Sequence, residues 1–286
     1  MSAHTIDERI ARAEVLVEAL PYIQRFSGKV LVIKLGGAVD ASESGADSVL
    51  QDVVLLRFVG MRPVLVHGGG SEISAWQRRV GVEPRFSDGL RVTDEQTMEI
   101  VKMVLTGKVG PSIVARLGAL GAGAIGLSGE DGPTLLVRPR AGNLGFVGDV
   151  DQVNTEPVTA VLEQGRIPVI ASIGLGYDGR AYNVNADSVA AEVAVALGAA
   201  KLIVLTDVDG VHDASGSLLT EIDAAGADSL IASGAVTGGM IPKVAAAVRA
   251  AAAGTAAHII DGRVPHSLLL ELLTEHGVGT MCIPTA

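Results

Sequence analysis

The sequence predicts an α/β fold with a central, mainly parallel β-sheet. Continuous apolar runs at residues 30–33, 63–66 and 202–205 are rich in valine, isoleucine and leucine. Such runs are typical of strands buried on both faces, as in parallel sheets. Segments with helical spacing of apolar residues separate them, as expected of βαβ units. Open α/β sheets bind ligands at the carboxyl ends of their strands, so we expect the functional site there.

The composition excludes several classes of protein. The chain has 286 residues, 48% of them hydrophobic and 19% charged, which suits one large domain or two ordinary ones with a sizeable core. A formal net charge of -10 repels nucleic acid and anionic membranes, and only 3% of residues are aromatic. Cys282 is the only cysteine, which excludes an intrachain disulfide and fits a reducing, cytoplasmic setting. We expect no secretory signal and no membrane-spanning stretch.

Residues 6–20 are expected to form a helix that precedes the sheet. Ile6, Ile10 and Val17 have helical spacing among charged residues, and Pro21 should kink or restart the helix. Two interpretations stay open: the helix lies on its own domain, or it docks on another subunit.

The first predicted strand, Val30–Leu35, leads into a glycine pair. Lys34 lies at its carboxyl end, and Gly36 and Gly37 leave backbone N–H groups free close to it. A cation beside bare amides indicates an anion site, most simply for a phosphate. The alternative is an ordinary turn with a solvated lysine.

The second predicted strand, Pro63–His67, is followed by three glycines at residues 68–70. Ser71 is the expected N-cap of a helix to Val80, so the glycine amides would lie at a helix N-terminus, where an anion is favoured. A flexible turn is the alternative. His67 is either a catalytic base or a strand-end histidine with a local hydrogen bond.

Arg91 precedes another predicted helix. Thr93 and Gln96 form a capping box for a helix to about Thr106, and a guanidinium just ahead of it suits capture of a carboxylate. The alternative is a surface arginine. Further strands are expected at Ala124–Leu127, Thr134–Val137 and Pro168–Ser172, a helix at Thr155–Gln164 and a hairpin or loop at residues 142–148.

Two asparagines and an aspartate gather before the next helix. Asn183 and Asn185 share one face if the segment is extended, and Asp187 is the expected cap of the helix Ser188–Leu197. Capping alone would explain Asp187, and a ligand role is the alternative. Gly198 ends this helix and marks the best seam between two halves of the chain.

Acidic residues and a second lysine follow in the last third of the chain. The strand Lys201–Thr206 leads to Asp207 and Asp209, whose carboxylates can handle Mg²⁺ or ribose hydroxyls. Lys243 lies in the first turn of an alanine-rich helix, where the helix dipole disfavours a cation unless an anion is bound. A solvated lysine is the alternative. A strand at Ala257–Ile260, a helix at His266–Glu275 and a strand near Thr280–Ile283 complete the prediction.

Two lysines beside glycines, an arginine, an Asn/Asp cluster and an Asp-rich strand end together indicate phosphoryl transfer. Positioning and charge neutralisation supply most of the catalysis in that reaction. The sequence has no P-loop, no GxGxxG at a helix start and no recognisable nucleophile motif.

Six motifs, in this order, resemble those of the amino acid kinase family. They are Lys34–Gly37, His67–Gly70, Gly89–Asp94, Asn183–Asp187, Leu205–Val211 and Gly238–Lys243, and the likeness runs from about residue 28 to residue 283. More narrowly, they resemble members that phosphorylate the side-chain carboxylate of N-acetyl-L-glutamate with ATP in arginine biosynthesis, giving an acyl phosphate. The resemblance implies a three-layer αβα sandwich.

The resemblance also implies roles for individual residues. Lys34 and Lys243 would stabilise the transferring phosphoryl group, and Asp187 would orient both lysines. The substrate would be bound by Gly69, Gly70, Arg91, Asn183 and Asn185, with Arg91 on its α-carboxylate. ATP would contact Gly36, Gly37, Thr206, Asp207, Gly210, Gly238 and Met240. Mg²⁺ would be held through the nucleotide phosphates rather than by a protein metal site.

Within the family, the N-terminal helix resembles that of the arginine-inhibited enzymes, where it interlaces dimers into a ring-shaped hexamer, a trimer of dimers. The implied effector site comprises Tyr22, Lys201, His258, Glu271 and Gly277, with Glu271 facing the guanidinium of L-arginine. The implied division of the chain is an oligomerisation arm at residues 1–27, a substrate lobe at 28–198 and an ATP lobe at 199–286.

Three positions depart from the family pattern: Ser71 replaces a usual proline, Gly110 a usual asparagine and Glu130 a common lysine. None removes a proposed catalytic group. Two other functions stay open, a kinase for carrier-protein-linked glutamate or aminoadipate and a catalytically silent arginine-sensing or partner-binding module. The negative net charge gives little support to carrier docking, and both lysines with Asp187 argue against a silent module.

Overall fold

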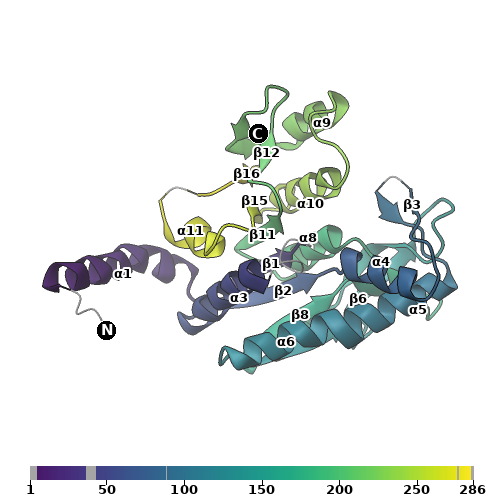
Figure 1. Ribbon diagram of the computed structural model, residues 1–286, viewed down its shortest axis with the longest axis horizontal. Helices are drawn as coiled ribbons and strands as arrows, with labels where there is room; N and C mark the ends of the chain where they lie inside the picture. The colour runs from purple at the N-terminus through teal and green to yellow at the C-terminus, as the bar shows by residue number, and fades with distance from the viewer. Residues whose placement is uncertain (1–4, 37–42, 88, 276, 285–286) are drawn as a thin grey trace.

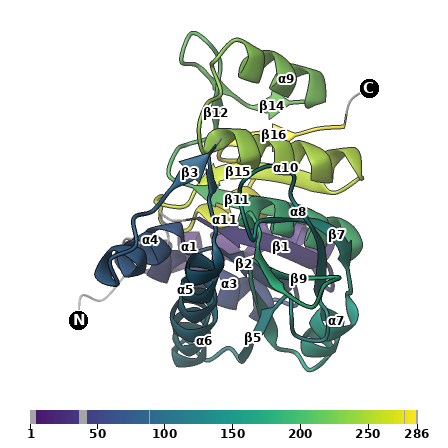
Figure 2. The same ribbon diagram turned by 90° about the vertical axis from the view of Figure 1, so that its right-hand side faces the viewer.

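An eight-stranded sheet forms the centre of the molecule. The computed structural model describes residues 5–36, 43–87, 89–275 and 277–284. Neighbouring strands of the sheet are parallel except β15 and β16, which are antiparallel. In spatial order the strands are β14 (Glu221–Ile222), β16 (Thr280–Cys282), β15 (Ala256–Asp261), β11 (Lys201–Thr206), β1 (Val30–Leu35), β2 (Arg62–His67), β8 (Ile167–Ala171) and β5 (Ala124–Ser128). Figure 2 shows β14 near the top of the molecule, β1 and β2 near its middle and β5 at the bottom.

Hydrophobic cores lie on both faces of this sheet. Leu31 and Ile33 of β1 belong to one core, whereas Val32 between them belongs to the other, because successive side chains of a strand point to opposite faces. The first core contains side chains of α3 (Glu43–Phe58), α4 (Gly70–Arg79), α5 (Glu95–Val104), α6 (Gly110–Ala119) and α11 (Ser267–Leu273). The second contains side chains of α7 (Glu156–Glu163), α8 (Ala186–Ala196), α9 (Ala224–Ala232) and α10 (Met240–Ala252). The predicted α/β fold with a mainly parallel sheet is confirmed, and the two cores give it three layers.

One helical stretch runs further than the sequence predicts. The helix expected to end near Thr106 continues from α5 through the π-helical turn η1 (Leu105–Val109) into α6. Pro111 lies in the first turn of α6, where a missing N–H costs little, so it does not break the helix. The N-cap of α5 also differs from the predicted Thr93. It is Asp94, whose side chain accepts a hydrogen bond from the backbone N–H of Thr97.

Smaller β-elements surround the main sheet. The predicted hairpin or loop at residues 142–148 is a hairpin connection, because the strands on either side of it pair antiparallel. A four-stranded sheet has the order β10 (Ala181–Asn183), β9 (Ile173–Gly176), β6 (Leu135–Pro139) and β7 (Gly148–Val153). Two antiparallel pairs are β3 (Phe86–Ser87) with β4 (Leu90–Arg91), and β12 (Val211–His212) with β13 (Leu218–Leu219).

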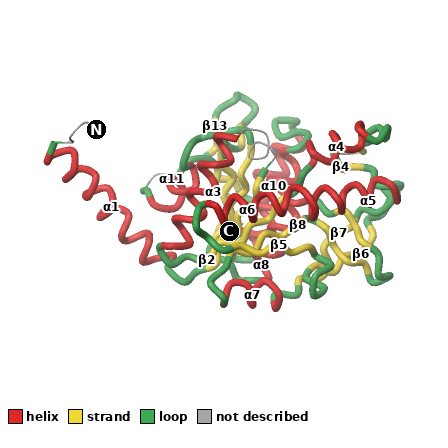
Figure 3. Tube along the Cα trace, turned by 60° about the horizontal axis from the view of Figure 1, so that its bottom comes forward, coloured by secondary structure: helices red, strands yellow, loops and turns green. Residues whose placement is uncertain are grey.

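The N-terminal helix α1 (Ile6–Phe26) extends away from the rest of the chain, as Figures 1 and 3 show. The helix continues through Pro21, so of the two predicted effects of this residue, a kink or a restart, the restart is wrong. Apolar side chains are exposed along it, at Ile6, Ile10, Val15, Leu16, Val17 and Leu20. No helix within the described residues is long and apolar enough to cross a membrane.

Candidate active site

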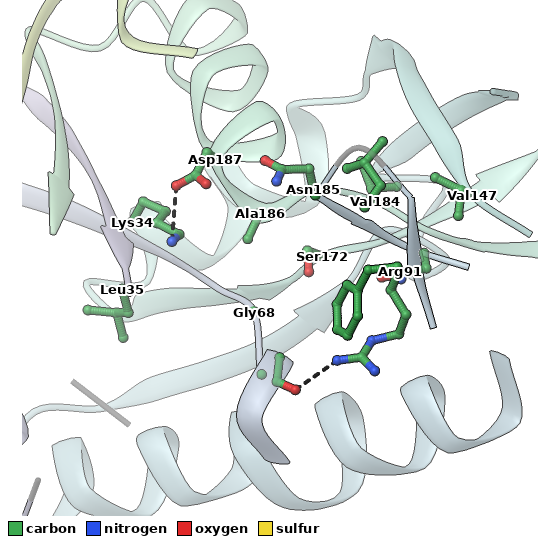
Figure 4. Close-up of a pocket in the computed structure, with 16 residues that line it drawn as sticks. Lys34, Leu35, Gly68, Arg91, Val147, Ser172, Val184, Asn185, Ala186 and Asp187 are labelled. Carbon is green, nitrogen blue, oxygen red and sulfur yellow. Dashed lines mark hydrogen bonds and ion pairs between the residues drawn. The ribbon is translucent and has the colours of Figure 1, made fainter. Parts of the chain in front are cut away.

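The carboxyl ends of β1, β2 and β8 meet at one cavity of about 210 Å³. Because neighbouring parallel strands end at the same edge of a sheet, residues far apart in sequence come together there. The cavity is lined by all five predicted substrate-binding residues, Gly69, Gly70, Arg91, Asn183 and Asn185, and by Lys34 and Asp187. Figure 4 shows Lys34 and Asp187 pointing toward each other at one end and Arg91 at the other.

The ion pair at the inner end joins Nζ of Lys34 to Oδ1 of Asp187 at 3.0 Å, and both side chains are buried. The prediction that Asp187 caps α8 is wrong. Asn185 is the N-cap, and its Oδ1 accepts a hydrogen bond of 3.0 Å from the backbone N–H of Ser188. The capping requirement of α8 is thus met one residue outside the helix, which leaves the Asp187 carboxylate free to face the lysine.

A second cavity of about 450 Å³ adjoins this ion pair. Five predicted residues line it, Gly36, Thr206, Asp207, Met240 and Lys243, together with Val208 and Gly239, which the sequence analysis misses. Nζ of Lys243 lies 3.9 Å from Oδ2 of Asp187 and donates a 3.0 Å hydrogen bond to the Gly239 carbonyl. Asp187 therefore faces both lysines, one from each cavity.

The electrostatics of the second lysine follow from its burial. Burial lowers the pKa of Lys243, and the positive charge of Lys34 lowers it further, while Asp187 and Asp207 oppose the change. Two ammonium groups at one carboxylate leave a net positive charge at the junction. The junction therefore suits a group with several negative oxygens.

Of the four glycines predicted to contact ATP, only Gly36 lines the second cavity within the described residues. A side chain on Gly36 would collide with the carbonyl oxygen of Leu205, so the first strand can approach β11 only with glycine there. Gly37 falls outside the described residues. Gly238 lines a neighbouring groove with Ile241 and Pro242, and Gly210 packs against Leu218 and Thr280; neither lines the second cavity.

Arg91 is held at the outer end of the first cavity. Its Nη2 donates to the Gly70 carbonyl at 2.8 Å and to Ser74 Oγ at 2.9 Å, and its Nη1 donates to Gln77 Oε1. The Phe86 ring covers the guanidinium, with 4.7 Å between Cζ and the ring centroid. Burial, and then the charge of Arg78, lowers the pKa of Arg91 to about 10. The alternative of a solvated surface arginine is therefore wrong.

His67 does not line either of these cavities. Its ring faces a separate cavity of about 340 Å³, where Nδ1 hydrogen-bonds to the Gly68 carbonyl at 2.9 Å and burial lowers the pKa of the imidazole. Of its two interpretations, the strand-end histidine with a local hydrogen bond matches this geometry. The departure at Gly110 lies here too, since a Cβ at that residue would lie 3.2 Å from His67 Nε2.

The other two departures leave the first cavity unchanged. Ser71 does not cap its helix as predicted, because α4 begins at Gly70 with Gly69 as its N-cap residue. Glu130 forms an exposed ion pair of 2.9 Å with Lys102.

Apart from the cavity at His67, a further cavity of about 470 Å³, called the third cavity below, lies between α1, α11 and the sheet. All five predicted effector residues line it, Tyr22, Lys201, His258, Glu271 and Gly277. Glu271 Oε1 lies 3.1 Å from Lys201 Nζ and 2.7 Å from His258 Nδ1. Burial alone would raise the pKa of Glu271, but the hydrogen bond and charge of His258, and then Lys201, lower it to about 2. The pocket therefore holds a permanent carboxylate.

Sequence reasoning misses several residues of these cavities. Phe86 and Ser172 line the first cavity, and Gln77 contacts Arg91 from outside it. The sequence signal for Gln77 is a polar residue on the buried side of an amphipathic helix, with Ile73 one turn before it.

Sequence comparison identifies relatives over nearly the whole chain. The sequence model of the amino acid kinase family matches residues 29–261. An acetylglutamate kinase of Synechococcus elongatus is 50% identical over 289 residues, which covers 99% of this chain and 96% of the relative. An acetylglutamate kinase of Thermosynechococcus vestitus is 51% identical over 278 residues, or 95% of this chain and 94% of the relative.

Among solved structures, N-acetylglutamate synthase from Neisseria gonorrhoeae in complex with coenzyme A and N-acetyl-glutamate superposes with a TM-score of 0.84 at 28% identity. The match covers 96% of this chain but only 64% of the synthase chain. The same synthase in complex with coenzyme A and L-arginine gives a TM-score of 0.81 at 27% identity.

Proposed function

The chain belongs to the amino acid kinase family, and we propose that its two adjoining cavities carry out the ATP-dependent phosphorylation of the side-chain carboxylate of N-acetyl-L-glutamate, a step of arginine biosynthesis. The observation that carries the proposal is Asp187, whose carboxylate faces Lys34 in the first cavity and Lys243 in the second. Relatives with about half of their residues identical over nearly the whole chain bear the name of this activity.

The central difficulty of the reaction is charge. The attacking carboxylate is already ionised at pH 7 and needs no general base, but it must approach a triphosphate of the same sign. Lys34 and Lys243 offset this repulsion, and Asp187 fixes where both ammonium groups point. A carboxylate oxygen forms a bond to the γ-phosphorus, the bond from phosphorus to the β–γ bridging oxygen breaks, and ADP leaves with that electron pair.

The first cavity fits the acceptor substrate. Arg91 binds the α-carboxylate of N-acetyl-L-glutamate, and Asn183 and Asn185 contact its N-acetyl group. The amides of Gly69 and Gly70 lie at the N-terminus of α4, where they favour the reacting carboxylate. Nδ2 of Asn183 donates to Thr93 Oγ1 at 3.2 Å, which fixes the orientation of that amide.

The second cavity fits ATP, with Thr206, Asp207, Gly239 and Met240 around the nucleotide. Within the described part of the chain, no group of three or more His, Cys, Asp and Glu side chains could hold a metal ion. We propose that Mg²⁺ is held through the nucleotide phosphates, with Asp207 as the acidic side chain among the residues that line the cavity. When bound, the ion would neutralise phosphate charge.

The third cavity is proposed as an inhibitory site for L-arginine. Glu271 would receive the guanidinium, and Tyr22 of α1 would close the pocket from the side of the arm. The relationship to a synthase whose structure was determined with L-arginine supports an amino-acid effector. The same cavity joins α1 to α11, so that binding there can alter the position of the arm.

We assign residues 28–198 to the acceptor lobe and residues 199–286 to the nucleotide lobe, with the boundary at Gly198. Both lobes share one sheet, since β1 pairs with β11 across that boundary. Residues 1–27 form the oligomerisation arm, and the exposed apolar side chains of α1 support its docking on another subunit in a hexamer.

The test is ADP release by the purified protein with Mg-ATP and N-acetyl-L-glutamate, with L-glutamate as the control acceptor, each with and without L-arginine. Turnover only with the acetylated acceptor supports the kinase, and suppression by arginine supports the effector site. Turnover that arginine leaves unchanged would reject the effector role alone. No turnover with either acceptor would reject the kinase and favour the carrier-linked substrate or the silent sensor.

A further inference from the structure

Among the residues that the structure describes, the surroundings of Arg91 are polar but carry no opposing charge. Arg91 is only 7% exposed, and the hydrogen-bond partners of its guanidinium are the carbonyl of Gly70, the hydroxyl of Ser74 and the side-chain amide of Gln77. Within the described residues, no carboxylate pairs with it. A buried cation normally has a paired anion, so these neutral partners leave its charge uncompensated.

Gln77 has a fixed orientation that suits this arrangement. Its side chain is buried, and its Nε2 donates to Thr97 Oγ1 of α5 at 3.3 Å. The amide must present Oε1 to Arg91, because a guanidinium can only donate and the amide nitrogen cannot accept. The helix that carries Gln77 also begins at Gly70, so one rigid element positions the amides of the cavity and the guanidinium.

The neutrality of this contact has a consequence for binding. A glutamate at the same place would form a buried ion pair with the guanidinium and satisfy its charge inside the protein. An incoming carboxylate would then have to compete with that internal anion. Three of the five N–H bonds of Arg91 are engaged by neutral oxygens, which leaves two donors and the full charge for a ligand.

We infer that Gln77 is a positioning residue that holds Arg91 in place while preserving its charge for the α-carboxylate of the acceptor substrate. Phe86 completes the arrangement, because its ring covers one face of the guanidinium without providing an anion. This inference rests on the proposed function, since it names the residue that makes the acceptor site selective for a second carboxylate.

Two acceptors separate this role from a general effect on folding. N-acetyl-L-glutamate carries the α-carboxylate, whereas 4-acetamidobutyrate has the same reacting carboxylate and acetamido group without it. The variants are Gln77→Glu, which adds an internal anion, and Gln77→Leu, which removes the acceptor at similar volume. Gln164→Glu, at the exposed end of α7, is the matched control for added charge.

We expect Gln77→Glu to lower kcat/KM for N-acetyl-L-glutamate by about 10- to 100-fold, mainly by raising KM. The reason is that the new glutamate competes with the α-carboxylate of the ligand for the charge-assisted hydrogen bond to Arg91. Turnover of 4-acetamidobutyrate and the KM for ATP should stay within about twofold. Gln77→Leu should lower kcat/KM for the first acceptor alone, by about 3- to 10-fold. Gln164→Glu should leave kcat/KM unchanged for both acceptors.

An equal loss with both acceptors, or an unchanged ratio between them in both variants, would overturn the inference. If Gln77→Glu does not fold, the acceptor ratio of Gln77→Leu decides the matter in the same way. A parent enzyme inactive with N-acetyl-L-glutamate would instead reject the proposed function, so the two failures are distinguishable.

Discussion

Oδ1 of Asp187 lies 3.0 Å from Nζ of Lys34, and this contact joins the first turn of α8 to the carboxyl end of β1. Both side chains are buried, so water screens the pair weakly and their relative geometry is well determined. The second oxygen of the same carboxylate faces Lys243, 3.9 Å away. One acidic group therefore faces both of the cations that we propose to contact the transferring phosphoryl group.

Asp187→Asn tests this arrangement. The change preserves shape but removes the charge between two ammonium groups, so the lysines should repel and lose their orientation. We expect kcat to fall by about 100-fold or more, with the KM for ATP changed by less than about fivefold. Steady-state kinetics measure both. Asp149→Asn, which removes an exposed ion pair with Arg140, is the matched control. A kcat within a few-fold of the parent would contradict the role of Asp187.

The deprotonation of Lys243 is expected to cause the alkaline limb of the pH–rate profile. Burial lowers its pKa below the ordinary 10.5, and the residue is useful only while protonated. Turnover should therefore be full below this lowered pKa and fall as pH rises through it, at a pH under 10.5. Lys243→Arg should have a lower kcat but lose this limb, because arginine stays charged. If the variant retains the limb at the same pH, another group causes it.

Much of the site follows from the sequence because strand ends are easy to locate. The run before Lys34 is apolar throughout, which requires burial on both faces, and Leu31 and Val32 do lie in opposite cores. Parallel strands that are joined by helices have their carboxyl ends at the same edge of the sheet. Lys34 and the glycines after His67 are therefore expected to lie close together, and they line one cavity. Both conclusions need only the order of elements.

Other features depend on contacts between distant segments, which a local pattern does not contain. Asn185 and Asp187 are both good helix caps, and the choice between them depends on Lys34, which a different strand supplies. Gly110 and Pro111 resemble helix breakers, yet a π-helical turn lets the helix continue. The contact of Gln77 with Arg91 likewise depends on how α4 packs.

Glu271→Gln tests the proposed effector site. The parent carboxylate has a pKa of about 2 instead of 4.5, so its charge, and the stability that it contributes, are present above pH 4.5 and lost as pH falls toward 2. At neutral pH the variant should bind L-arginine at least about tenfold more weakly, as measured by calorimetry, because a charge-assisted contact to the guanidinium is lost. Glu163→Gln on the surface of α7 should bind arginine as the parent does. Equal affinity in all three proteins would exclude Glu271 as the guanidinium partner.

The exposed apolar side chains of α1 predict how the chain assembles. Leu16 is 74% exposed on a helix that extends away from the rest of the chain, which is unfavourable unless another subunit covers it. Leu16→Asp should bury a charge at that contact and reduce a hexamer to dimers, as measured by light scattering during gel filtration. Because the active site is remote from this helix, turnover without arginine should stay within about threefold of the parent. Val264→Asp, an exposed apolar position in the nucleotide lobe, should leave the mass unchanged. A hexamer that survives Leu16→Asp, or a parent that is never larger than a dimer, would show that α1 does not hold subunits together.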